Sequence, residues 1–190
     1  MPQFKKEEVK SKIDNTAILL FSKNGYNSTT VSSISKASGI PVGNIYRYYK
    51  SKKEILNEVL PENLLENLAQ ILEDKITNWK TSEGSEELSF LNSKQFINFL
   101  VRNRTYLLIH LKMDDGSDGI KSIFVNCLLK ILKTTYEEEN RYISIIKAIY
   151  YKLIELLEEA LNNYSSEDDL YNAFDLIHTY HMFGITKIYK

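Results

Sequence analysis

Apolar residues recur three and four positions apart along most of this 190-residue chain, and that spacing predicts amphipathic helices. The first helix is expected over about Lys6 to Asn24, with Gly25 ending it. Only seven glycines and three prolines interrupt the sequence, which favours long helices over many short strands. We therefore expect an all-α fold of about nine helices, with a three-helix N-terminal head on a larger helical body.

Two short helices joined at a glycine are predicted after the first helix. Thr29 and Thr30 can accept hydrogen bonds from the unpaired amides at a helix start, and Gly39 can adopt positive φ where that helix ends. Pro41 suits the first turn of the next helix, which does not need its missing N–H. The pair is a helix-turn-helix whose inner face is expected to hold Val31, Ile34, Ala37, Ile40, Ile45 and Tyr49.

The outward side of the second helix carries side chains suited to a DNA groove. Asparagine can pair bidentately with adenine and arginine with guanine, while tyrosine hydroxyls can reach phosphate oxygens. Asn44 and Arg47 provide the first two groups, and Tyr46 and Tyr48 the third. These residues indicate sequence-specific DNA binding, and the alternative is a solvated helix pair in an ordinary bundle.

Basic residues gather in the same part of the chain. Residues 1–53 hold ten Lys and Arg against three Asp and Glu, so they are formally +7. The remaining residues must then sum to −8, because the whole chain is formally −1. One basic end on a near-neutral chain is typical of a module that meets a polyanion there. Charge scattered for solubility alone is the alternative interpretation.

The same region resembles the TetR family of transcriptional regulators. The resemblance implies that Thr30 and Tyr46 contact phosphate, that Lys52 anchors the start of a fourth helix, and that the outer face of residues 41–48 reads bases. Two positions depart from the family pattern, since Pro41 replaces a usual serine and Val42 a common polar residue. The segments that carry the resemblance are Phe21-Ser22-Lys23-Asn24-Gly25-Tyr26, Thr29-Thr30-Val31, Ile34, Ala37-Ser38-Gly39-Ile40, Gly43-Asn44-Ile45-Tyr46-Arg47-Tyr48-Tyr49 and Lys50-Ser51-Lys52-Lys53-Glu54-Ile55-Leu56.

Together the residues and the resemblance predict a DNA-binding domain over residues 1–51 and a ligand-binding and dimerisation domain over 52–190. Val42 is hypothesised to meet a thymine methyl group. The residues expected to contact DNA are Thr29, Thr30, Pro41, Val42, Gly43, Asn44, Tyr46, Arg47, Tyr48 and Lys52.

The body is expected to consist of long helices separated by polar breaks. Pro61 should kink or interrupt the helix that begins near Lys52. A loop is expected over residues 81–87 and a break over 114–119. The expected helices run from about Lys52 to Trp79, through Phe96 to His110, from Ile120 to Tyr136, from Asn140 to Asn163 and from Glu167 to Ile188.

The last two of these helices carry wide apolar stripes. The resemblance implies that they form a four-helix interface in a homodimer, which would place two recognition helices on one near-palindromic site. The alternative is that both stripes pack within the monomer. The expected interface residues are Ile149, Leu153, Leu156, Leu157, Ala160, Leu170, Phe174, Ile177, His181, Gly184 and Ile188.

An apolar and aromatic set in the middle of the chain suits either a ligand pocket or a plain core. The resemblance implies a small apolar or aromatic effector there, which would separate the DNA-binding heads; a subset of the family responds to a protein partner instead. The expected lining residues are Trp79, Phe96, Phe99, Asn103, Tyr106, His110, Phe124, Cys127 and Tyr150.

Other classes of function fit poorly. No Gly-rich phosphate loop, serine elbow or zinc-type cysteine spacing occurs, so we expect no enzyme, no cofactor and no metal. His178 and His181 share a helix but lack further ligands, and the apolar setting of Cys127 predicts burial over reactivity. Without a secretory signal or a bilayer-length apolar run, a cytoplasmic location is expected.

The sequence therefore predicts a homodimeric regulator of transcription that binds a double-stranded operator, acting as a repressor that a small effector releases. One alternative is a regulator of the same build whose body binds a partner protein. Another, from a different class, is a helical ligand-binding or enzymatic protein that never meets DNA.

Overall fold

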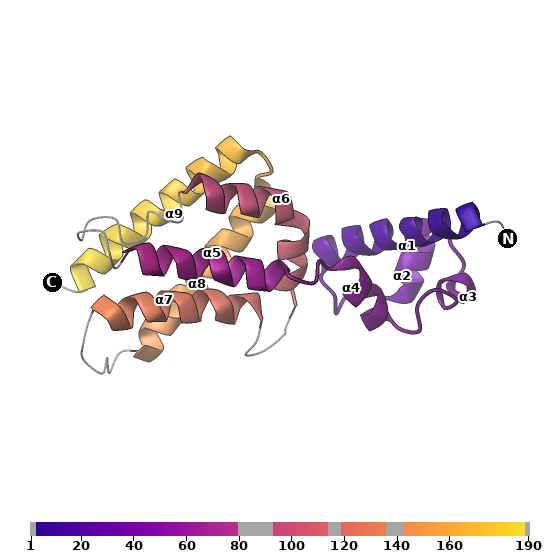
Figure 1. The fold of residues 1–190 in the computed structure, drawn as a ribbon, viewed down its shortest axis with the longest axis horizontal. Helices are drawn as coiled ribbons and strands as arrows, with labels where there is room; N and C mark the ends of the chain where they lie inside the picture. Colours follow the sequence, from indigo (N-terminus) through magenta and orange to yellow (C-terminus); the bar gives the residue numbers. More distant parts are fainter. Residues whose placement is uncertain (1–2, 80–92, 114–118, 136–142, 189–190) are drawn as a thin grey trace. The chain divides into compact units, whose positions relative to one another are not determined.

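The computed structural model describes residues 3–79, 93–113, 119–135 and 143–188. All regular elements in those ranges are helices, which confirms the all-α prediction (Figure 1). Their bounds are Gln3–Asn24 (α1), Val31–Ser38 (α2), Val42–Ile45 (α3), Lys52–Val59 (α4), Leu64–Trp79 (α5), Lys94–Leu111 (α6), Ile120–Thr135 (α7), Ile143–Asn163 (α8) and Glu167–Ile188 (α9).

These bounds agree with the periodicity of the sequence to within a few residues. Pro61 interrupts the helix expected from Lys52 to Trp79, which is therefore two helices, α4 and α5. The loop predicted at 81–87 and most of the break predicted at 114–119 lie outside the described residues. None of the helices in the described ranges has the length and apolar character needed to cross a bilayer.

The chain divides into two compact units, one made of Met1–Leu64 with Thr105–Asp114 and the other of Leu65–Arg104 with Asp115–Lys190. Helix α6 therefore contributes its first residues to the second unit and its last residues to the first. A functional boundary between residues 51 and 52 stays a prediction, because packing alone does not assign function to either unit.

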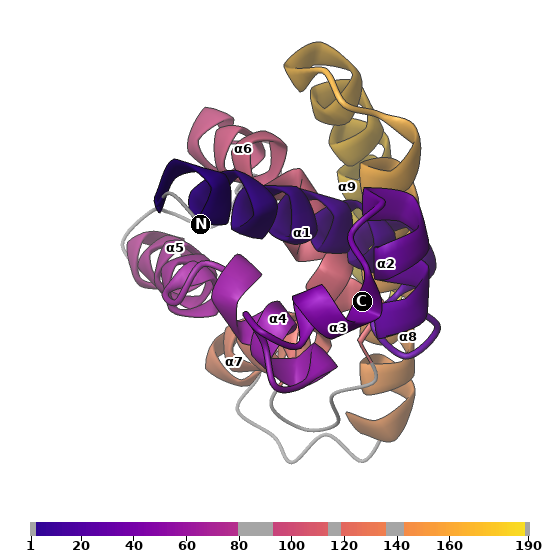
Figure 2. The ribbon, with the colours of Figure 1, turned by 90° about the vertical axis from the view of Figure 1, so that its right-hand side faces the viewer.

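Helix α1 is the central element of the first unit, and α2, α3 and α4 lie on one side of it (Figures 1 and 2). Its residues Ile13, Ala17 and Phe21 share one face at a spacing of four and are fully buried. They form one apolar core with residues of α2, α3 and α4 and of the turn after α3, namely Ile34, Ile45, Tyr49, Ile55, Leu56 and Val59. The helix ends where Gly25 adopts a φ of +80°.

Residues from the end of α6 complete the core of the first unit. Ile109 is fully buried in it, and Tyr106 and Met113 pack against it. The Lys112 ammonium donates to the main-chain carbonyl oxygens of Ser22 at 2.7 Å and of Lys23 at 3.3 Å, at the C-terminus of α1. A cation is favourable there because the last carbonyls of a helix lack partners within it. The N-terminal head thus includes a segment about fifty residues beyond the predicted motif.

The second unit contains α5, the first part of α6, α7, α8 and α9. The ring of Phe96 is fully buried, and its centroid lies 6.3 Å from those of Phe124 and Phe174. Arg104 of α6 donates from Nε to the carbonyl oxygen of Leu161 at 2.5 Å and from Nη2 to that of Asn162 at 3.0 Å. These bonds satisfy carbonyls at the C-terminus of α8, so they join α6 to α8.

Candidate nucleic-acid interface

The start of α2 is capped by Thr30, as predicted. Its hydroxyl oxygen accepts from the Ser33 N–H at 3.0 Å, and the Ser33 hydroxyl oxygen accepts from the Thr30 N–H at the same distance. This reciprocal arrangement is a capping box, which satisfies two of the amides that a helix start leaves unpaired. Thr30 is exposed, so its side chain remains accessible from solvent at the edge of the helix-turn-helix.

Thr29 has a different environment, and the prediction that it contacts DNA is wrong for its side chain. Thr29 is only 1% exposed. Its hydroxyl donates to the carbonyl oxygen of Gly25 at 2.8 Å and to that of Leu20 at 3.2 Å, at the end of α1. The two adjacent threonines therefore have different roles: Thr29 binds carbonyl oxygens at the end of α1, and Thr30 caps the start of α2.

The turn between α2 and α3 is built around Gly39, which adopts the predicted left-handed conformation with φ of +68°. Ser38 is buried beside it, and its hydroxyl oxygen accepts from the Ile40 N–H at 3.2 Å. Ala37 is exposed, which corrects its placement on the inner face. Ser38 is buried in place of Ala37 because it lies four residues after Ile34, and residues four apart share one face of a helix.

Helix α3 is shorter than expected, and tight turns continue it to Tyr49. The N–H groups of Tyr48 and Tyr49 both donate to the Ile45 carbonyl oxygen, at 2.9 and 3.0 Å. Ile45 and Tyr49 are buried in the head, as the sequence predicted. The residues between these two anchors are therefore held in helical turns even though α3 itself ends at Ile45.

The face expected to read bases points away from the core of the first unit. Tyr46 is 52% exposed, and Asn44 and Tyr48 are half-buried, so the last two offer less of their surface. The other members of this face, Pro41, Val42, Gly43 and Arg47, are exposed. The unit thus presents a guanidinium, a phenol and an apolar side chain together on α3 and the turns that follow it, and those groups suit contacts to base edges and phosphates.

Lys52 does not point outward with these residues. Its ammonium donates to the main-chain carbonyl oxygens of Tyr26 at 2.7 Å and Thr29 at 2.8 Å, and it lies 4.0 Å from the centroid of the Tyr26 ring. Burial lowers the pKa of this lysine. The side chain therefore joins the start of α4 to the connection between α1 and α2, instead of extending toward a phosphate.

Other lysines of the head are exposed and were not among the expected DNA contacts. Lys36 lies on the outer side of α2, and Lys50 and Lys53 flank the start of α4. Ser51 caps that start by accepting from the Glu54 N–H at 3.1 Å. The Glu54 carboxylate accepts from the Lys50 N–H at 2.6 Å. The lysine run was visible in the sequence, but which of its members point inward depends on packing.

Substitution of Lys52 and of its neighbour Lys53 tests whether the first lysine stabilises the head and the second contacts DNA. Lys52→Met should lower the free energy of unfolding of the head by about 1.5 kcal/mol, because two carbonyls lose a charged donor. Lys53→Gln should leave unfolding unchanged but flatten the dependence of log K for DNA on log salt by about one unit. Urea unfolding and salt-dependent titration of both variants measure these effects. A flatter slope with unaltered stability for Lys52→Met would show that Lys52 contacts phosphate instead.

The residues expected to line an effector pocket are divided between the two units. Phe96, Phe124, Cys127 and Tyr150 are buried in the second unit, where burial raises the pKa of the Cys127 thiol to about 12. Phe99 and Asn103 are half-buried there. Tyr106 and His110 belong to the first unit, and the side chain of Trp79 lies outside those that are described, so the pocket stays a prediction.

The stripes expected to form a dimer interface are largely internal. Their buried members are Leu153, Leu157, Ala160, Leu170, Phe174 and Ile177, whereas Ile149 and Leu156 are exposed. The side chains of His181, Gly184 and Ile188 lie outside those described. The six buried residues are unavailable to a second copy, because α8 and α9 pack against each other and α8 packs against α7. Large apolar residues exposed on the two helices include Ile145, Ile149, Leu156, Leu176 and Tyr180.

Comparison with known proteins finds similarity between the helix-turn-helix region and bacterial regulators. A family model described as bacterial regulatory proteins, tetR family, matches residues 13–59. The fatty acid metabolism regulator protein of Bacillus subtilis is 31% identical over 87 residues, which are 44% of this chain and 42% of that protein. The biofilm operon icaADBC negative transcriptional regulator IcaR of Staphylococcus epidermidis is 28% identical over 134 residues, 70% of this chain and 69% of that protein.

These matches support the assignment of the head more strongly than that of the body. The chain spans less than half the length of the Bacillus subtilis regulator that it matches. A solved structure of Thermus thermophilus FadR is 18% identical, with 90% of this chain and 91% of that one covered at a TM-score of 0.47. That likeness is too low to bear on function.

Proposed function

We propose that this chain is a member of the TetR family of bacterial regulatory proteins, whose model matches residues 13–59, and that it is a sequence-specific DNA-binding regulator of transcription. The observation that carries the proposal is the outward face of the helix-turn-helix, where Val42, Tyr46 and Arg47 are exposed between the buried anchors of the head. A short helix with such a face fits the major groove of duplex DNA.

In the proposed complex, Arg47 makes a bidentate contact to a guanine and Val42 meets a thymine methyl group. Thr30 and Tyr46 contact phosphate oxygens, together with the exposed lysines Lys36 and Lys53. Phosphate contacts supply affinity and orientation, whereas base-edge contacts supply the sequence preference. The basic charge of the N-terminal residues adds steering toward the duplex.

Selection from a random duplex library tests the proposal. The purified chain should enrich one family of sites over several rounds, and the enriched site should compete for binding far better than a scrambled duplex of equal length. Binding that shows no preference for any duplex, at low and at physiological salt, would contradict the proposal and favour a ligand-binding protein that does not meet DNA.

We further propose a homodimer, with an interface that differs in part from the stripes expected from the sequence. The support is the exposure of apolar side chains on α8 and α9, above all Leu176 at 72% and Tyr180 at 74%, one turn apart. Exposed apolar residues that gather on a helical face mark contacts with other molecules. A two-fold dimer would bring two heads to one near-palindromic operator.

Replacement of Leu176 by lysine should weaken dimerisation about tenfold or more, because a charge would be buried without a partner at the interface. Sedimentation equilibrium over a range of concentrations measures this, with twice 22.1 kDa as the expected mass of the unaltered protein. Tyr164→Lys is a matched control, since Tyr164 is an exposed aromatic residue at the end of α8. Equal dimer affinity in both variants would exclude this face.

A repressor released by a small apolar or aromatic effector is the form of regulation that we propose. It is supported by the aromatic interior of the second unit around Phe96, and by the name of IcaR as a negative regulator. Operator affinity measured across a panel of apolar and aromatic compounds tests it. A compound that is the effector should lower the affinity of the chain for its operator. Unchanged operator affinity throughout the panel, together with capture of a protein by the second unit, would instead favour control by a partner protein.

A further inference from the structure

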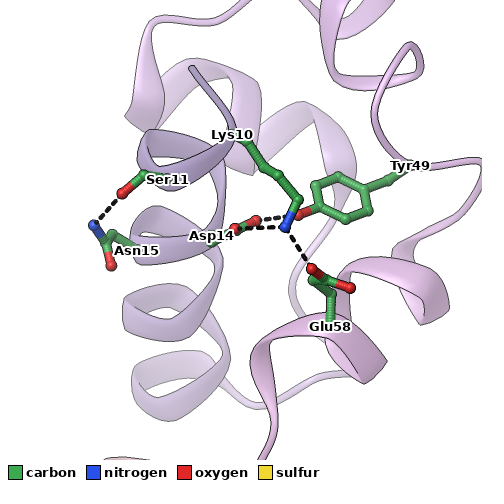
Figure 3. Close-up of polar contacts among 6 residues, drawn as sticks. All are labelled: Lys10, Ser11, Asp14, Asn15, Tyr49 and Glu58. Carbon is green, nitrogen blue, oxygen red and sulfur yellow. Dashed lines mark hydrogen bonds and ion pairs between the residues drawn. The ribbon is translucent and has the colours of Figure 1, made fainter. Parts of the chain in front are cut away.

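A polar network inside the head connects α1 to the end of the recognition segment. The Tyr49 hydroxyl donates to the Asp14 carboxylate, and the Lys10 ammonium lies 3.5 Å from that carboxylate (Figure 3). Lys10 also pairs with Glu58 of α4 and stands 5.7 Å from the centroid of the Tyr49 ring. Three parts of the head therefore meet at Asp14 and Lys10: α1, the turn after α3, and the last turn of α4.

The two halves of this network differ in solvent exposure. The Asp14 side chain is 20% exposed and the ring of Tyr49 is buried, whereas the Glu58 side chain is 50% exposed. Burial is the main cause that raises the pKa of Tyr49, followed by its hydrogen bond to Asp14, so the phenol stays protonated and acts as a donor. The exposed pair of Lys10 and Glu58 contributes little by comparison, because solvent screens it.

The position of Tyr49 gives its hydrogen bond a role in recognition. Helix α3 has four residues and no side-chain cap at its start. The main-chain hydrogen bonds from Asn44 to Tyr49 all run within residues 41–49, so they hold the turns together but do not orient them against the rest of the head. Tyr46 and Arg47 lie between the buried anchors Ile45 and Tyr49. Apolar packing of Ile45 tolerates small rotations, whereas the bond from the Tyr49 hydroxyl to Asp14 defines one direction.

We propose that Asp14 and the Tyr49 hydroxyl are positioning residues for DNA recognition, which orient the segment carrying Tyr46 and Arg47. The inference rests on the proposed function. It concerns residues that do not touch DNA and that act through the geometry of the exposed face. A misplacement of that face weakens base-edge contacts, which require defined geometry, more than phosphate contacts, which tolerate rearrangement.

Tyr49→Phe in the full-length chain tests the proposal, because it removes the hydroxyl and keeps the buried ring. Affinity for the selected operator should fall about tenfold, while affinity for a scrambled duplex should change less than about twofold. In an Arg47→Ala background the same change should have little further effect, because the contact that it positions is absent. Circular dichroism at the assay temperature establishes that each variant is folded.

Variants at Asp14 and at the exposed half of the network serve as controls. Asp14→Asn keeps an oxygen that accepts from the Tyr49 hydroxyl and should retain the operator preference, whereas Asp14→Leu should lose it as Tyr49→Phe does. Lys10→Met should leave the preference unchanged. An equal loss of affinity on operator and scrambled DNA, or additive effects of Tyr49→Phe and Arg47→Ala, would overturn the inference. If the unaltered chain selects no operator, the proposed function fails instead.

Discussion

Ile109→Ala should destabilise the DNA-binding head by about 2 to 5 kcal/mol, although residue 109 lies about sixty positions beyond the end of the helix-turn-helix at Tyr49. Ile109 is fully buried in the core formed by α1, α2, α3 and α4. Truncation removes apolar contact and leaves a cavity, and the surrounding helices can collapse only partly to fill it. The same substitution should also lower operator affinity, because Ile45 and Tyr49, which anchor the recognition segment, belong to the same core.

Hydrogen exchange of the amides of α1 and α4 measures this effect within the first unit. Leu19→Ala is a matched control, since Leu19 lies on α1 with its side chain 66% exposed and should change stability by less than about 0.5 kcal/mol. Protection lost only in the second unit, with the head unaffected, would show that the end of α6 does not belong to the head.

Arg47→Ala should cost about 1 to 3 kcal/mol of operator binding at each half-site, and both half-sites of a symmetric operator are affected. The arginine is exposed on the face between Ile45 and Tyr49, so truncation removes its contact without disturbing the core. The preference should relax at the base pair that Arg47 reads, because the guanine loses its bidentate partner while the other contacts remain.

Titration against the selected operator and against single base-pair substitutions of it measures this preference. Lys36→Ala, which removes an exposed cation from α2, should instead weaken all duplexes by a similar factor. If Arg47→Ala also weakened every duplex equally, Arg47 would be a phosphate contact, and the base-reading role would pass to another residue of the same face.

Much of the fold followed from local pattern. The spacing of apolar residues indicated the helices, and the conformations of Gly25 and Gly39 agree with the predicted helix ends. Thr30 caps α2, as its position before an apolar run indicated, and Ser51 caps α4 in the same way. These features depend on neighbours within about four residues, so the sequence carries nearly all the information that decides them.

The residues whose predicted roles were corrected depend instead on contacts between segments that are distant in the sequence. Thr29 and Lys52 have the chemistry of DNA contacts, yet both bind main-chain carbonyls of the connection between α1 and α2. Tyr106 fitted an aromatic pocket by type but packs in the head. The apolar stripe of α8 was equally suited to the interior of a monomer and to an interface, and burial assigns Leu153 and Leu157 to the interior while Ile149 and Leu156 stay exposed.

The sequence by itself determined that this chain is helical, where most helices begin and end, and that its basic N-terminal part carries a helix-turn-helix with an arginine and tyrosines facing outward. Only the tertiary structure decided which lysines are used internally, that Ile109 and Lys112 complete the head, and that Asp14 binds the Tyr49 hydroxyl. The physical reason is separation along the chain. Caps and amphipathic faces form between near neighbours, whereas these contacts exist only after distant helices have packed.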